Sequence, residues 1–231
     1  MKQLHSIIWA GILFIGLGNG FAQGFVNLDF AQANLSGYTA GVYVPIANAI
    51  PGWTGYIGTN QQTTVLYNDL AIGSAVLSLL DTNYISPAAI IPGSSDMVVI
   101  QAGFPSKPAS IAQSAMIPAT AKSILFAANY PYGSGWQVTI AGKIIPVTQV
   151  SAINSNYAFF EGDISTYAGH VDELRFTALY VSSPGGSLFL DSIQFSATPI
   201  PEPSSVALAA LGGAWFILRR WSARRNIFPQ S

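Results

Sequence analysis

The segment Glu173-Leu174-Arg175-Phe176-Thr177-Ala178-Leu179 alternates between polar and apolar side chains with a period of two. In an extended chain its charged and hydroxyl side chains fall on one face, and Leu174, Phe176 and Ala178 fall on the other. A strand with one apolar face and one mostly polar face is typical of an antiparallel sheet that is wetted on one side. The segment therefore predicts a β-strand that covers a hydrophobic core.

Short runs of this kind recur through residues 23–197, separated by clusters of Gly, Pro, Asn, Asp and Ser. Helical patterns are nearly absent, apart from one turn expected at Ile164–Tyr167, with Asp163 as its N-cap and Gly169 at its end. The body is therefore predicted to be all-β, a two-sheet antiparallel sandwich. Its expected strands are Phe25–Phe30, Thr63–Tyr67, Ala75–Leu80, Met97–Gln101, Ser123–Ala128, Trp136–Ile140, Ile144–Val150, Tyr157–Gly162, Glu173–Tyr180 and Leu188–Phe195.

The clearest local unit is a hairpin between Trp136 and Val147. Two strand-like runs are joined there by Ala141-Gly142-Lys143, and Gly142 is free to adopt a positive φ. Pro146 has no N–H to donate to a ladder. The second strand is therefore expected at a sheet edge or at a bulge.

The N-terminus has the three parts of an export signal. Lys2 supplies a positive charge, Ile7–Leu17 is apolar, and Gly20-Phe21-Ala22 places small residues before a cleavage point after Ala22. Residues 1–22 are therefore predicted to be a signal peptide that forms a helix and engages the export translocase.

The C-terminus carries a second apolar run, Val206–Leu218. Two serines separate this run from the tripeptide Pro201-Glu202-Pro203. The 13 uncharged residues of the run would make a helix of about 20 Å, against a hydrocarbon layer of about 30 Å. The run is short for a permanent anchor. The basic residues behind it resist crossing a bilayer and are expected to stay in the cytoplasm; they are Arg219, Arg220, Arg224 and Arg225.

The order of tripeptide, apolar run and arginines resembles the PEP-CTERM sorting tail of bacterial surface proteins. The resemblance implies that an exosortase-like membrane peptidase recognises Pro201, Glu202 and Pro203 and removes the tail. The chain would be held in the membrane before processing and would then reside at the cell surface or in the extracellular matrix. Its expected divisions are the body at 23–197, a linker at 198–204, and a hydrophobic helix with a basic tail at 205–231. The alternative is a simple, permanent C-terminal anchor.

The body resembles galactose-binding-like jelly rolls in three short motifs, Phe25–Phe30, Ile50-Pro51-Gly52-Trp53 and Phe189–Phe195. The resemblance implies a jelly-roll-like sandwich whose first and last strands lie near one another. It also implies a structural calcium ion between those strands, with Asp191 and either Asn27 or Asp29 as ligands. The family commonly has glutamate after the opening Phe, where this chain has Ala31, and this departure weakens the calcium prediction. No other cofactor is indicated.

The composition of the body excludes several classes of function. Residues 23–200 hold nine acidic and four basic residues, a net charge of −5, whereas nucleic-acid binding needs a basic patch. The chain has no cysteine and the body has one histidine, His170, so thiol chemistry is excluded and a zinc site is not indicated.

Two carboxylate pairs, Glu161 with Asp163 and Asp172 with Glu173, raise the alternative of a glycoside-processing enzyme. Their spacing alone does not place two acids across a sugar, so we expect no enzyme. Tyr130 and Tyr132 lie in a Pro/Gly loop, where exposed rings would stack on sugars. The leading hypothesis is a non-catalytic surface protein that binds extracellular polysaccharide, and a purely structural surface protein is the alternative.

Overall fold

The computed structural model of the chain describes residues 24–71, 73–86, 89–129, 135–180 and 186–199. Several predicted features lie outside the described residues, including both terminal helices, the signal peptide and the loop tyrosines. These features are residues 1–22, Tyr130, Tyr132, the motif Pro201, Glu202 and Pro203, and the arginines Arg219, Arg220, Arg224 and Arg225.

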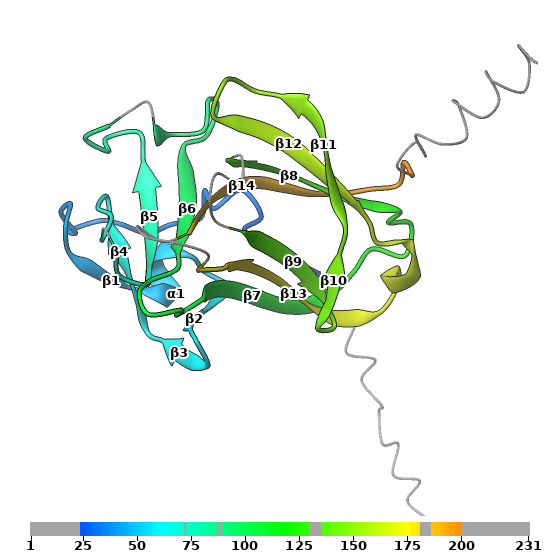
Figure 1. Ribbon diagram of the computed structural model, residues 1–231, viewed down its shortest axis with the longest axis horizontal. Coiled ribbons are helices and arrows are strands. Elements are labelled where there is room, and N and C mark those ends of the chain that lie inside the picture. Colours follow the sequence, from blue (N-terminus) through cyan, green and yellow to red (C-terminus); the bar gives the residue numbers. More distant parts are fainter. Residues whose placement is uncertain (1–23, 72, 87–88, 130–134, 181–185, 200–231) are drawn as a thin grey trace, which may run out of the picture.

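The described residues form two β-sheets packed face to face, as the sequence predicts (Figure 1). Eight strands make the larger sheet, which extends from the left of this view to its upper right. In spatial order they are β1 (Tyr43–Pro45), β4 (Thr64–Tyr67), β5 (Val76–Asp81), β6 (Asp96–Gln101), β14 (Ser187–Ser196), β8 (Ser123–Asn129), β12 (Tyr157–Asp163) and β11 (Val147–Ala152).

Six strands make the second sheet, which forms the lower layer in Figure 1. Their spatial order is β10 (Lys143–Ile145), β9 (Trp136–Ile140), β13 (Val171–Ala178), β7 (Ala109–Met116), β2 (Thr54–Ile57) and β3 (Asn60–Gln62). The alternation predicted for β13 is confirmed, because Leu174, Phe176 and Ala178 are fully buried between the sheets.

One strand pair departs from the predicted antiparallel pattern, because β4 and β5 run parallel. Side chains hold their ends together. The Tyr67 hydroxyl and the Asn68 amide each donate to a carboxylate oxygen of Asp81 at 2.6 Å, and the Asp81 N–H donates to Asn68 Oδ1 at 2.8 Å. Burial opposes ionisation of Asp81, but hydrogen bonds to its carboxylate from Tyr67, Asn68 and Asn83 outweigh burial and lower the pKa of this carboxyl.

The predicted wetting of one face does not hold for the eight-stranded sheet around β5, β6, β8 and β12, where both faces carry buried apolar side chains. A second hydrophobic cluster, which includes Leu80, Met97 and Val99, lies on its outer face. The connection between β5 and β6 adds Ile91 to this cluster, and Ala89 O accepts a hydrogen bond from the Tyr157 hydroxyl at 2.6 Å. Burial under this connection raises the pKa of Tyr157 to about 12.

The predicted opening strand at Phe25–Phe30 is wrong. Asn27 and Phe30 have positive φ values of 52° and 55°, which break an extended chain into turns. Side chains replace the missing ladder: Val26 N donates to Gln113 Oε1 at 2.7 Å, and Gln113 Nε2 donates to Val26 O at 3.1 Å. We call residues 24–32 the opening segment.

The opening segment lies against the closing strand β14, which confirms that the two ends of the body are neighbours. Ile193 N donates to Leu28 O at 2.9 Å, and the rings of Phe25 and Phe195 are 5.0 Å apart between centroids. The termini of the domain are therefore held together through a short loop segment rather than through a strand pair.

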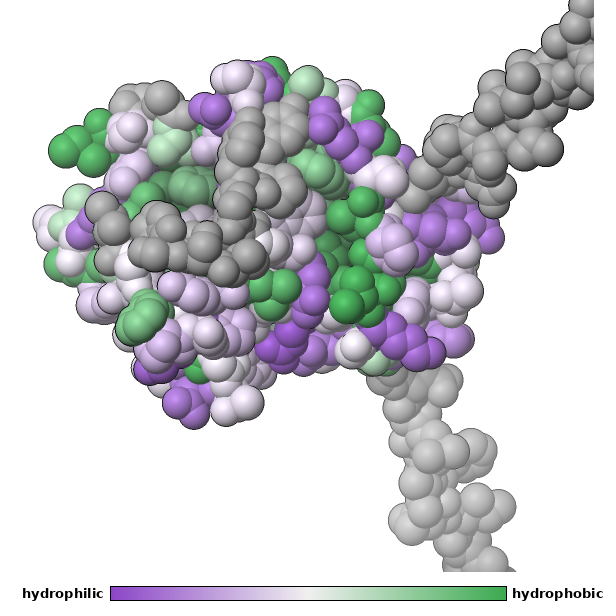
Figure 2. All heavy atoms as spheres, viewed as in Figure 1, coloured by the Kyte–Doolittle hydropathy of each residue, from purple (hydrophilic) through white to green (hydrophobic). Residues whose placement is uncertain are grey.

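The predicted hairpin forms between β9 and β10 with a loop of two residues rather than three. Ala141 and Gly142 both have positive φ, 50° and 75°, and Lys143 already pairs with Ile140. Pro146 lies where the chain leaves β10, an edge of one sheet, and enters β11, an edge of the other. The predicted edge position is confirmed, but the single strand predicted at Ile144–Val150 is wrong, because Pro146 divides it into two strands of different sheets. Figure 2 shows apolar side chains gathered over the part of the molecule where Figure 1 draws β10 and β11. Ile144 of β10 and Val150 of β11 are exposed.

Helix is confined to short pieces in the described part of the chain. The sequence predicted a helical turn at Ile164–Tyr167, and the structure has the turn η2 at Ser165–Tyr167. The predicted N-cap is wrong, because Ile164 rather than Asp163 holds that position. Asp163 Oδ1 accepts a hydrogen bond from Ser165 N at 2.8 Å. The sequence did not predict the four-residue helix α1 (Ile46–Ala49). None of the helices formed by the described residues has the length and apolar character needed to span a bilayer.

Candidate functional site

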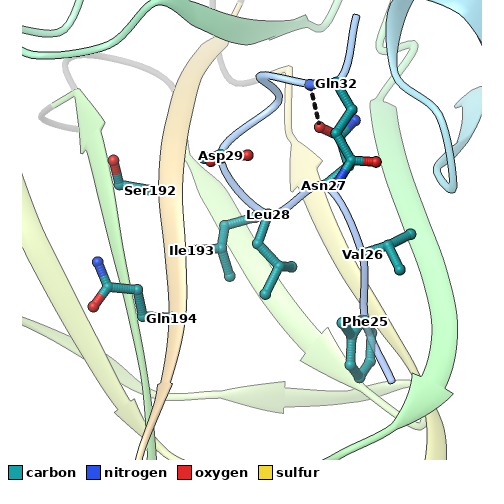
Figure 3. A pocket seen from close by; sticks show the side chains of 9 residues that line it. All are labelled: Phe25, Val26, Asn27, Leu28, Asp29, Gln32, Ser192, Ile193 and Gln194. Atoms are coloured by element: carbon teal, nitrogen blue, oxygen red, sulfur yellow. Dashed lines mark hydrogen bonds between the residues drawn. The ribbon is translucent and has the colours of Figure 1, made fainter. Parts of the chain in front are cut away.

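A pocket of about 470 Å³ opens between the opening segment and β14. This volume falls within the range of small-molecule sites in proteins. Asp29 from the opening segment, and Ser192 and Gln194 from β14, stand around an apolar floor (Figure 3). The lining residues are Phe25, Val26, Asn27, Leu28, Asp29, Gln32, Ser192, Ile193 and Gln194.

The shape of the opening segment depends on Asn27, which is 3% exposed. Its Oδ1 accepts a hydrogen bond from Gln32 N at 3.0 Å, and its Nδ2 donates to Pro51 O at 3.2 Å. Its backbone oxygen accepts from Trp53 Nε1 at 3.0 Å. Asparagine adopts positive φ more readily than most residues, which explains this residue type at the turn that presents Asp29.

A β-bulge shapes the other wall of the pocket. The register of β14 against β8 shifts between Asp191 and Gln194, and Ser192 has a φ of 53°. The bulge places Ile193 in the core at 3% exposure, while Gln194 remains exposed. Ser192 and Gln194 of β14 therefore line the same pocket as Asp29.

The electrostatic potential around the pocket is negative. Burial raises the pKa values of Asp191 and Asp96, and the negative charge of Asp29 raises both further. None of the nine described lining residues is lysine or arginine. The pocket therefore combines carboxylate, amide and hydroxyl groups with apolar surface and disfavours anionic ligands.

Asp191 lies next to this pocket in the chain but does not line it. Its side chain is 3% exposed, and its Oδ2 accepts hydrogen bonds from the hydroxyls of Ser94 and Ser192, the latter at 3.2 Å. Its Oδ1 is buried without a hydrogen-bond partner. An unpartnered buried carboxylate oxygen is costly as an ion, which favours either a proton or a bound cation at this position.

The oxygen atoms around Asp191 are poorly suited to bind calcium. Both polar atoms of the Asn27 side chain are engaged in holding the opening segment. The described ranges hold no group of three or more acidic, histidine or cysteine side chains suited to a metal, whereas calcium takes six to eight oxygen ligands. Asp29, Asn27 and Asp191 remain candidate ligands, and the calcium ion stays a prediction.

We expect Asp191→Asn to raise the melting temperature near neutral pH, and this gain to shrink as the pH falls towards about 4. A carboxyl whose pKa is raised by folding holds its proton more tightly in the folded chain. Its contribution to stability is complete below the unfolded pKa of about 3.9 and is lost as the pH rises through the higher folded pKa. Thermal scans across this range measure the difference.

The same scans with added calcium separate a proton from a cation at Asp191. A calcium-dependent rise in the melting temperature that Asp191→Asn abolishes would establish the ion. A lower melting temperature of the variant in the absence of calcium would contradict the view that the buried charge is destabilising.

Two of the four acids proposed as catalytic pairs, Glu173 and Asp163, have structural roles. Glu173 accepts two hydrogen bonds from Arg175, at 2.8 and 3.1 Å. The hydrogen bond from Ser165 N lowers the pKa of Asp163, whereas a general acid of a glycosidase needs a raised pKa. His170 is exposed, and its backbone oxygen accepts from Ile117 N.

The sequence identified part of this site. It named Asn27 and Asp29, which line the pocket, and it missed Gln32, Ser192 and Gln194. The available signal was the polar pair Ser192 and Gln194 within the closing strand, but no pattern in the sequence marks the bulge of β14 at Ser192.

Comparisons with known proteins leave the family of the chain open. No family model matches it, and no curated protein sequence matches it. Four chains of solved structures match. One is the Caldicellulosiruptor saccharolyticus CBM27-1 module, described in complex with mannohexaose, with a TM-score of 0.39 and 11% identity over 68% of this chain and 97% of that chain. These values assign no ligand to the protein.

Proposed function

We propose that this chain is an exported, non-catalytic protein of the cell surface or extracellular matrix whose sandwich binds neutral polysaccharide. The observation that carries the proposal is the pocket between the opening segment and β14. Its hydrogen-bonding groups, Asp29, Ser192 and Gln194, surround an apolar floor. Sugars present hydroxyl groups at their edges and apolar C–H surface on their faces, and this lining complements both.

The charge of the pocket narrows the class of ligand. Asp29 acts electrostatically on the neighbouring carboxyls Asp96 and Asp191, and none of the described lining residues is cationic. Uronic acid, sulfate and phosphate groups would be repelled by this field. Neutral hexose units, held by hydrogen bonds to a carboxylate and an amide, are the ligands that this lining favours.

A non-catalytic role agrees with the positions of the acids. A glycosidase needs two carboxyl groups about 5 to 9.5 Å apart across the scissile bond, one with a raised pKa. In the described structure Glu173 is paired with Arg175, and Asp163 accepts the hydrogen bond that begins η2. Asp191, whose pKa is raised, is 3% exposed and is not accessible to a sugar.

Export and tail removal are part of the proposal and rest on the sequence. The signal peptide at 1–22 would direct the chain to the export translocase, and an exosortase-like peptidase would act at Pro201-Glu202-Pro203. The described residues contain both hydrophobic clusters and all strands of the two sheets. Loss of the two ends would leave the residues of these clusters and strands in the chain.

We expect Asp29→Ala and Gln194→Ala each to weaken binding of a neutral oligosaccharide about 10-fold, corresponding to about 1.4 kcal/mol for the loss of a hydrogen bond to the sugar. A glycan array on the full-length chain, purified in mild detergent, selects the ligand, and isothermal titration calorimetry measures the affinity. Thr148→Ala on β11 is the matched control, because Thr148 is exposed and does not line the pocket.

Other results would redirect the proposal. Unchanged affinity in both pocket variants would place the ligand elsewhere, with the loop of Tyr130 and Tyr132 as the next candidate. No binding across the array would favour the purely structural role. Release of reducing sugar that Glu161→Gln abolishes would identify an enzyme.

A further inference from the structure

One edge of the sandwich carries exposed aliphatic side chains. The strand β10 is outermost in one sheet and β11 is outermost in the other, and Pro146 joins them. Ile144 of β10 is 64% exposed and Val150 of β11 is 46% exposed, with the half-buried Val147 between them in the chain. Figure 2 shows apolar side chains gathered over these two strands. We call Ile144, Val147 and Val150 the edge patch.

The backbone of this edge is poorly suited to a polypeptide that would add as a further strand. The register of β11 against β12 shifts between Gln149 and Ser151, and such a bulge twists a sheet edge away from a neighbouring strand. The strand β10 has only three residues. The edge patch therefore favours a partner that contacts its apolar side chains and needs no backbone ladder.

The described chain ends beside the edge patch. Ser196 of β14 pairs with Ser123 of β8, which pairs with Asp163 of β12. The next strand, β11, begins at Val147 beside the end of β12. Three strand spacings therefore separate Ser196 from Val147, a distance of about 14 Å. The Ser123 hydroxyl donates to Thr198 O at 2.9 Å, so the chain stays at this end of the sheet as it leaves the body.

The length of chain beyond this point limits how far the body can lie from a membrane. Pro199 is the last described residue, and the apolar run Val206–Leu218 begins seven residues later. Seven residues span at most about 25 Å when fully extended. When Val206–Leu218 is inserted in a bilayer, the end of the body that holds Thr198 must lie within this distance of the run. The edge patch is then within reach of the lipid surface.

Two lysines at this end of the body suit a lipid partner. Lys143 is exposed and directly precedes Ile144. Lys122 is also exposed, and its N–H donates to Ser196 O at 2.7 Å; its charge offsets that of the neighbouring Asp163. A lysine can lay its apolar stem along lipid and extend its ammonium group to a headgroup phosphate. The strand β11 itself carries no charged residue.

We propose that the edge patch is a membrane-contact surface, which rests on the outer lipid surface while Val206–Leu218 remains inserted. The inference rests on the proposed function for the inserted tail, and it concerns a different part of the body from the pocket. The tether raises the effective concentration of the patch at the lipid, so that a small apolar contact suffices. Removal of the tail then releases the body, because the strength of such a contact scales with its small apolar area.

Single cysteines can test this contact, because the chain has no cysteine of its own. The full-length chain is reconstituted into vesicles of phosphatidylcholine and phosphatidylglycerol, with a nitrobenzoxadiazole label on Ile144→Cys or Val150→Cys. Tyr43→Cys is the matched control, because Tyr43 is 60% exposed and β1 lies at the opposite edge of the eight-stranded sheet from β11.

We expect the labels at positions 144 and 150 to emit at shorter wavelength than the label at position 43. Interfacial apolar groups lie about 5–10 Å deep, at the boundary of headgroups and acyl chains. A lipid with a nitroxide at this depth should therefore quench both labels. They should also lose most of the quenching by aqueous iodide that the label at position 43 retains.

Flotation of the vesicles reports whether the chain is inserted. An inserted chain whose labels at positions 144 and 150 stay as open to iodide as the control would overturn the edge patch and leave the tail. A chain that does not float with the vesicles would overturn both the inserted tail and the contact, whereas glycan binding tests the pocket separately. Labels that are shielded from iodide but not quenched by the lipid nitroxide would also overturn the contact and assign this edge to a second copy of the chain.

Discussion

Replacement of Trp53 by alanine is expected to lower the free energy of unfolding by about 3–5 kcal/mol, the usual cost of removing a buried tryptophan. Trp53 is 4% exposed, and its ring centroid lies 5.7 Å from that of Phe30 and 6.3 Å from that of Phe176. Its Nε1 donates to Asn27 O at 3.0 Å. The substitution therefore opens a cavity in the core and also releases the opening segment that forms the pocket.

Chemical denaturation followed by circular dichroism measures this loss. The control is Tyr43→Ala, because Tyr43 is 60% exposed and an exposed substitution usually changes stability by less than about 0.5 kcal/mol. A loss below about 1 kcal/mol for Trp53→Ala would contradict the packing of the opening segment onto the core.

The change Glu202→Ala is expected to block removal of the C-terminal tail and to leave the precursor in the membrane. The reason is that Glu202 is the only charged residue of Pro201-Glu202-Pro203, and a peptidase that reads this motif has no other charge in it to recognise. Intact-mass spectrometry of the protein recovered from the native envelope distinguishes the processed from the unprocessed chain.

A conservative control separates recognition of the motif from membrane insertion. Ser205→Ala lies beside the motif, keeps the apolar run Val206–Leu218 intact and should be processed as the wild type is. A wild-type protein that still carries Val206–Leu218 when mature would contradict tail removal and would favour the permanent anchor.

The fold class could be predicted because several strands and turns have recognisable local sequence patterns. In β13 the fully buried Leu174 and Phe176 alternate with the ion-paired Glu173 and Arg175. The hairpin of β9 and β10 follows from Gly142, whose positive φ the turn requires. These patterns depend only on residues close together in the chain. They predict the structure correctly because each of these strands has one face toward the core.

The sequence missed elements whose structure depends on distant partners. The central strand β7, ASIAQSAM, is rich in small residues with weak strand preference, and it forms because β13 and β2 flank it. Phe25–Phe30 has a strand-like composition, yet the side chains of Asn27 and Gln113 set its path. Such side-chain contacts, between residues far apart in the chain, have no periodic signature.

The candidate site likewise combines residues that a local sequence motif indicates with residues that only the tertiary structure reveals. Asn27 and Asp29 could be named from the opening motif, but their partners on β14 become visible only through the bulge at Ser192. The pairing register between strands that are far apart in the chain could not be predicted from the sequence.

Hydrogen–deuterium exchange of the full-length chain, with and without a neutral oligosaccharide, tests the proposed glycan site most directly. Peptides that cover the opening segment and residues 190–195 should exchange more slowly when the sugar is bound, because Asp29, Ser192 and Gln194 line one pocket. Peptides from β11 should be unchanged. Protection confined to residues 129–136, which hold Tyr130 and Tyr132, would contradict the pocket as the site of binding.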